Sequence, residues 1–244
     1  MPHDYRFRSA GYSWSSYFPF AVKWLIISNT AIFVVCFLFP SKFVFDWFAL
    51  SPYLVLKRFA IWQLVTYMFL HGGIGHILFN MLALWMFGMD LERDWGTKRF
   101  LKYYFICGIG AGICDVLVNA LMGNFNTRTI GSSGGIYGLL LAFGVLYPDR
   151  IVLMSFLFPI KAKYFVMIMG GIAFLNSVGS AGSGVSNVAH LGGMLFGYAY
   201  LRMRFLRVDT GKLIQRYQTW KMERAKRKFQ VYMRKQGRGG PWVN

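Results

Sequence analysis

The sequence predicts an all-α polytopic membrane protein built as a bundle of six transmembrane helices. Hydrophobic residues make up 56% of its 244 residues and charged residues only 15%, whereas soluble domains carry about 25% charge. The apolar residues lie in six runs, and the Lys and Arg residues gather in alternate loops and in the C-terminal tail. That asymmetry is typical of a polytopic membrane protein. The net charge of +18 therefore indicates topology, and we expect no nucleic-acid partner.

The predicted spans cover residues 18–39, 76–89, 100–121, 133–147, 164–174 and 188–201. Several are shorter than the roughly 20 residues that cross a bilayer. We therefore expect either longer helices than these runs or helices buried among the others. The fifth span is the least defined, because residues 151–160 are also apolar; Pro159 favours a break before it, and Lys161 and Lys163 mark its start.

Six spans place both termini on one side of the membrane, and nearly all Lys and Arg residues fall on that side. This predicts cytoplasmic termini, with an N-terminal cytoplasmic segment (1–20), a six-helix domain (21–204) and a basic cytoplasmic tail (205–244). The compact six-span form favours the bacterial cytoplasmic (inner) membrane. The long apolar loop 40–71 is expected to lie in the outer interface.

The tail carries apolar residues at roughly helical spacing among its basic residues, such as Leu213, Tyr217 and Trp220. Two interpretations stay open. The tail is either a solvated basic helix that fixes topology, or an interfacial helix that binds anionic lipid of the cytoplasmic leaflet.

The stretch GSSGGIYG at residues 131–138 places serines among glycines where the chain enters an apolar helix. Ser133 and Tyr137 are four residues apart and share a helix face. Gly134 and Gly138 form a small-xxx-small pair, which permits close helix approach. Glycine-rich serine segments more often serve packing alone, so two other spans decide between packing and chemistry.

Two other spans supply polar groups. In the sixth span, His190 shares a face with Gly193 and Gly197, so glycines on both helices would allow a hydrogen bond between Ser133 and His190. In the second span, His76 and Asn80 are four residues apart and share a face. Ionisable groups are costly inside a membrane and usually functional there. A nucleophile, a base and hydrogen-bond donors are the parts of an acyl-transfer site.

A metal site is the first alternative, because His71, His76 and His190 could bind zinc. The metalloprotease pattern His-Glu-x-x-His is absent, and the acid inside a span is Asp115, for which we expect a structural hydrogen bond with Asn119. We therefore expect no metal and no cofactor. The cysteines Cys36, Cys107 and Cys114 fit no metal or disulfide spacing and are interpreted as small hydrophobic residues.

Three motifs in this order resemble those of the rhomboid family of intramembrane serine proteases. His71-x-x-x-x-His76-x-x-x-Asn80 is similar to the second-span motif, and Gly131-x-Ser133-Gly134 to the nucleophile motif. The stretch Ala189-His190-x-x-Gly193-x-x-x-Gly197 is similar to the sixth-span motif. The resemblance covers residues 21–204 and lacks the Trp-Arg pair that some members carry in the first outer loop.

The resemblance implies a rhomboid-like fold and a serine endopeptidase with a dyad. Ser133 would be the nucleophile and His190 the general base, with no carboxylate as a third member. Its partners would be single-span membrane proteins, cleaved near the outer face of the bilayer.

The remaining site residues have supporting roles. Tyr137 would pack on the His190 ring, while His76, Asn80 and the backbone N–H of Ser133 would stabilise the oxyanion. His71 would brace the first loop. Two other classes of protein are alternatives: a non-catalytic scaffold or chaperone, which would be expected to lack the Ser or His, and a transporter, which would need a polar path through the spans.

Overall fold

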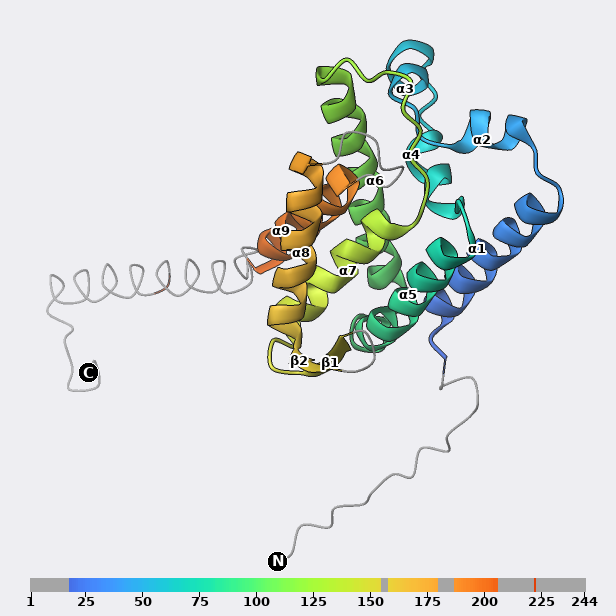
Figure 1. Ribbon diagram of the computed structural model, residues 1–244. Coiled ribbons are helices and arrows are strands. Elements are labelled where there is room, and N and C mark those ends of the chain that lie inside the picture. Colours follow the sequence, from blue (N-terminus) through green and yellow to red (C-terminus); the bar gives the residue numbers. More distant parts are fainter. Residues whose placement is uncertain (1–17, 155–157, 180–186, 206–221, 223–244) are drawn as a thin grey trace, which may run out of the picture. The chain divides into compact units, whose positions relative to one another are not determined.

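The computed structural model describes residues 18–154, 158–179, 187–205 and 222. The chain divides after Tyr200 into two units, and the arrangement below is that of the first. Its described part is mostly helical and contains one two-stranded hairpin (Figure 1). Most of the predicted N-terminal segment, and the predicted tail apart from Phe205 and Met222, lie outside the described residues.

Six helices overlap the six predicted spans: α1 (Phe20–Leu38), α5 (Ile74–Trp95), α6 (Thr97–Leu121), α7 (Ser133–Leu146), α8 (Ala162–Gly179) and α9 (Asn187–Phe205). In the described part of the chain, three of them, α1, α5 and α6, are long and apolar enough to cross a membrane. The expected lengthening is confirmed for α5, which has 22 residues. The predicted end of the second span at residue 89, with a loop from residue 90 to 99, is thus wrong in part, because residues 90–95 continue α5.

Helix α7 lies at the centre of the bundle, in contact with α5, α6 and α8 (Figure 1). It is apolar on all sides and buried along most of its 14 residues, with Leu139 and Ala142 fully inaccessible. A helix that is hydrophobic all round is a buried helix. Its short length fits this central position, because its neighbours cover it.

The predicted loop 40–71 is built from short helices: α2 (Lys42–Phe48), α3 (Pro52–Arg58), α4 (Gln63–Thr66) and the 3₁₀ turn η2 (Tyr67–Phe69). Pro52 occupies the first turn of α3, where its missing N–H costs nothing. The buried amide of Gln63 accepts from the Ser51 N–H at 3.0 Å and donates to the Trp47 carbonyl at 3.1 Å. The loop is therefore an ordered element that packs against α6.

An antiparallel hairpin, β1 (Ile151–Met154) with β2 (Phe158–Lys161), departs from the all-α prediction. Val152 is buried while its neighbours Ile151 and Leu153 are 58% and 49% exposed. Alternate burial is the period of a strand, although every residue of β1 is apolar. The hairpin leads directly into α8, since the Ala162 N–H donates to the Arg150 carbonyl at 2.8 Å.

The carboxylate of Glu92, near the end of α5, binds the start of α1. Its two oxygens accept the backbone N–H groups of Ala21 and Val22, each at 2.8 Å, and the residue is only 3% exposed. The first N–H groups of a helix lack partners within the helix, and negative charge is favourable there. Glu92 thereby fixes α1 to α5.

Candidate active site

The chain enters α7 through Gly131, which has a φ of +118°. Its N–H donates to the Tyr67 carbonyl at 2.9 Å. A Cβ at this position would lie 2.6 Å from Nε2 of His76. Both the backbone conformation and the space therefore require glycine here, and the second-span histidine lies directly against the entry to α7.

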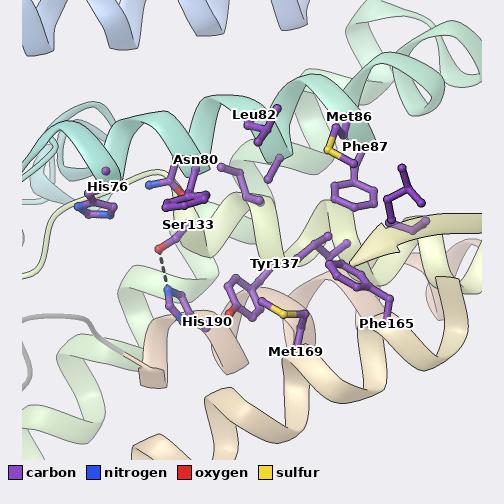
Figure 2. A pocket seen from close by; sticks show the side chains of 17 residues that line it. His76, Asn80, Leu82, Met86, Phe87, Ser133, Tyr137, Phe165, Met169 and His190 are labelled. Carbon is purple, nitrogen blue, oxygen red and sulfur yellow. Dashed lines mark hydrogen bonds between the residues drawn. The ribbon is translucent and has the colours of Figure 1, made fainter. Parts of the chain in front are cut away.

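Ser133, the first residue of α7, forms the hydrogen bond that the sequence predicts. Its Oγ lies 2.8 Å from Nε2 of His190 on α9 (Figure 2). When the serine hydroxyl donates to Nε2, the imidazole proton resides on Nδ1. That Nδ1 is buried and has no hydrogen-bond partner among the described residues, so no carboxylate in this part of the chain completes a triad.

The contact between α7 and α9 depends on Gly193. A Cβ at Gly193 would overlap the carbonyl oxygen of Gly134. The close approach of the two backbones, which the glycine pattern predicts, is thus present at the level of the dyad. Tyr137, one turn after Ser133, stacks on His190 with 4.1 Å between ring centroids and 5° between planes, and this restricts the rotation of the imidazole.

His76 and Asn80 of α5 also face this site (Figure 2). Asn80 is 7% exposed, and its Nδ2 is a buried donor with no partner among the described residues. Nδ1 of His76 accepts the Gly72 N–H at 3.4 Å, which leaves Nε2 as the donor in the neutral ring. The Ser133 N–H at the helix start also lacks a helical partner. Three donors are therefore available beside the serine.

His71 contacts residues next to the dyad, Ser132 and His76. It is 4% exposed, its Nε2 lies 3.3 Å from Oγ of Ser132, and its ring meets that of His76 edge-on at 5.0 Å. Burial, and secondarily the neighbouring His76, lowers the pKa of His71 to about 4, so its ring is neutral at pH 7. Ser132 is fully buried, so it is closed to solvent, while Ser133 lines a cavity.

The cavity has a volume of about 530 Å³ and lies between α5, α7 and α8. Ser133, His190, His76 and Asn80 line one end of it. Apolar side chains line the rest, including Phe87, Val152 and Phe165. These residues were not predicted from the sequence, because Phe165, for example, carries no signal that separates it from other residues of an apolar span.

Asp115 on α6 makes the predicted hydrogen bond with Asn119, whose Nδ2 lies 3.1 Å from Oδ1. A second, unpredicted bond comes from Oγ1 of Thr129, at 2.8 Å from Oδ2. Within the described ranges no three His, Cys, Asp or Glu side chains are placed to hold a metal ion. The expectation of a metal-free site stays a prediction.

Comparison with known proteins identifies relatives of this fold. The model of the Rhomboid domain matches residues 58–207. The chain is 29% identical over 185 residues to RHOMBOID-like protein 12, mitochondrial, of Arabidopsis thaliana, covering 69% of this chain and 54% of that protein. It is 35% identical over 137 residues to Rhomboid protease GluP of Bacillus subtilis, covering 56% and 25%.

A third relative, Rhomboid-like protease 5 of Toxoplasma gondii, is 36% identical over 154 residues, which cover 58% of this chain and 16% of that protein. The chain thus spans about half or less of the length of these three relatives. The matched region contains every candidate residue from His71 to His190. With its apolar helices, the protein is an integral membrane protein, and the chain belongs to the rhomboid family.

Proposed function

We propose that this protein is an intramembrane serine protease that cleaves single-span membrane proteins near the outer face of the bilayer. One observation carries the proposal: Oγ of Ser133 lies 2.8 Å from Nε2 of His190 at one end of a cavity that the unpaired Nδ2 of Asn80 also lines. Serine hydroxyls become effective nucleophiles when an adjacent base accepts their proton. Two of the relatives are named proteases, which agrees with this assignment.

In the first step, Oγ of Ser133 bonds to the carbonyl carbon of the scissile peptide while its proton passes to Nε2 of His190. The carbonyl oxygen becomes negatively charged, and Asn80, His76 and the Ser133 N–H donate to it. Each preorganised donor of this kind is worth about 3–4 kcal/mol in other hydrolases. The C–N bond then breaks, and His190 returns the proton to the departing amine.

A water molecule completes the cycle. His190 takes a proton from the water, whose oxygen attacks the acyl-enzyme, and collapse of the second intermediate returns the proton to Ser133. The stacked ring of Tyr137 keeps the imidazole in one plane through both steps, at 5° to its own plane. Because Nδ1 of His190 has no carboxylate partner in the described part, the unit that acts is a dyad.

The substrate is inferred from the site's surroundings. The cavity wall is almost wholly apolar, which suits a segment delivered from lipid rather than from water. A helical carbonyl is already hydrogen-bonded, so the substrate must unwind locally before attack, and helix-breaking residues should favour cleavage.

The proposal includes the predicted topology. We assign six spans to α1, α5, α6, α7, α8 and α9, with residues 21–204 as the protease domain and both termini in the cytoplasm. Ser133 then faces the outer side. The bacterial cytoplasmic membrane is the proposed location.

Cleavage in proteoliposomes tests the function. Purified protein is reconstituted with a single-span reporter protein, and fragments are measured by gel and mass spectrometry. We expect one cut near the outer end of the reporter's span, none with Ser133→Ala, and retention with Ser132→Ala. A cut that persists in Ser133→Ala would contradict the proposal, as would a wild-type protein that cuts no reporter with an unstable span.

A further inference from the structure

A buried carboxylate outside the dyad links two parts of the bundle. Asp115 is fully inaccessible, and such a group is costly unless its oxygens are hydrogen-bonded. The bond from Asn119, at 3.1 Å, joins residues one turn apart on α6. The bond from Oγ1 of Thr129, at 2.8 Å, joins α6 to the chain just before α7. Of these two bonds, the second constrains the position of another element.

Residues 129–132, here called the approach segment, are held along their length. Thr129 exchanges both backbone hydrogen bonds with Leu50, each at 2.9 Å. Two residues later, Gly131 donates to the Tyr67 carbonyl at 2.9 Å. The Tyr67 hydroxyl donates in turn to the Gly108 carbonyl on α6 at 2.6 Å. The segment is therefore fixed to α6 both through Asp115 and through Tyr67.

The approach segment offers little freedom for adjustment. At Gly131 even a Cβ would come within 2.6 Å of the His76 ring, and Ser132 is fully buried. A shift at Thr129 is therefore passed on to Ser133, whose hydrogen bond to His190 spans 2.8 Å. Misplacement of reacting groups by about 1 Å can lower a rate on the order of 100-fold.

We propose that Asp115 and Thr129 are positioning residues for Ser133. Their hydrogen bond sets where the approach segment enters α7, and so sets the distance from Oγ of Ser133 to His190. The inference rests on the proposed protease function, because its readout is the reactivity of Ser133.

The variants separate positioning from stability. Thr129→Val removes the hydroxyl and keeps the side-chain size and the backbone bonds to Leu50, while Thr129→Ser restores the hydroxyl. Asn119→Ala is the matched control, because it removes a different side-chain bond to Asp115 and leaves Thr129 in place. Asp115→Asn keeps one oxygen for the Thr129 hydroxyl, and Asp115→Leu keeps none.

The full chain in detergent is assayed for its rate of labelling by a fluorophosphonate, for kcat and KM on the single-span reporter, and for Tm. We expect Thr129→Val and Asp115→Leu to lose roughly tenfold in labelling rate and kcat, with KM within about twofold of wild type. Asn119→Ala, Thr129→Ser and Asp115→Asn should stay within about twofold in all three kinetic values.

Equal labelling rates for Thr129→Val and Asn119→Ala would overturn the inference, whatever their Tm values. If Thr129→Val does not fold, equal rates for Asp115→Asn and Asp115→Leu would overturn it in the same way. Wild-type protein that neither labels nor cleaves would instead overturn the proposed function, so the two failures are distinguishable.

Discussion

Replacement of Asn80 by leucine should move stability and turnover in opposite directions. Nδ2 of Asn80 is a buried donor without a partner among the described residues. A buried unpaired donor costs about 1–3 kcal/mol, and an apolar group of similar shape removes that cost. Asn80→Leu should therefore leave the free energy of unfolding unchanged or raise it by about 1–3 kcal/mol. The same change removes an oxyanion donor, which should lower kcat by about 100–1,000-fold.

The assay measures kcat and KM on the single-span reporter together with Tm in detergent. KM should change little, because the hydrogen bond forms with the charged oxygen of the transition state. Asn80→Ala should lower kcat in the same way. Met86→Leu, which changes another residue lining the cavity, is the control and should be nearly neutral. A kcat for Asn80→Leu within about threefold of wild type would refute Asn80 as an oxyanion donor.

Three further predictions concern packing, pH and the tail. Gly193→Ala would force its Cβ onto the Gly134 carbonyl. It should lower the free energy of unfolding by about 1–3 kcal/mol and remove most of the fluorophosphonate labelling of Ser133. Gly171→Ala, where a Cβ meets nothing within 4 Å, should change neither quantity. The pKa of His71 falls from 6.5 to about 4 on folding, so its neutral form contributes on the order of 3 kcal/mol to the free energy of unfolding above pH 6.5, and this contribution is lost as pH falls towards 4. Denaturant titrations should therefore show that the free energy of unfolding depends less steeply on pH in His71→Asn than in wild type, and an unchanged slope would contradict this. Deletion after Thr210 should preserve cleavage in detergent. A peptide of residues 209–244 should bind anionic vesicles more tightly than neutral ones, with affinity falling as salt rises. Equal binding to both kinds of vesicle would leave the tail only its topological role.

The helices and the dyad contact could be predicted because their signals are local. Apolar runs located α1, α5, α6, α7, α8 and α9, with ends that differ from the predicted ones by up to six residues. Gly134 and Gly138 on the helix of Ser133, with Gly193 on the helix of His190, predicted the approach of α7 to α9, and the structure shows it at Gly193. The hydrogen bond between Asp115 and Asn119 was also predictable, because residues four apart meet on a helix.

The missed features depend on contacts between distant residues. Glu92 binds the start of α1 about 70 residues away, and nothing near it in sequence indicates that contact. Thr129 reaches Asp115 from a segment without periodicity. The hairpin was hidden because Ile151, Val152 and Leu153 are all apolar, so their alternating burial leaves no alternating pattern in the sequence.

The central claim is that His190 activates Ser133, and covalent labelling tests it most directly. Full-length protein is treated with a fluorophosphonate, digested, and the modified residue located by mass spectrometry. We predict a single adduct on Ser133 that is lost in Ser133→Ala, reduced to background in His190→Ala, and kept in Ser132→Ala. An adduct on Ser132, or full labelling of Ser133 in a folded His190→Ala protein, would contradict the account.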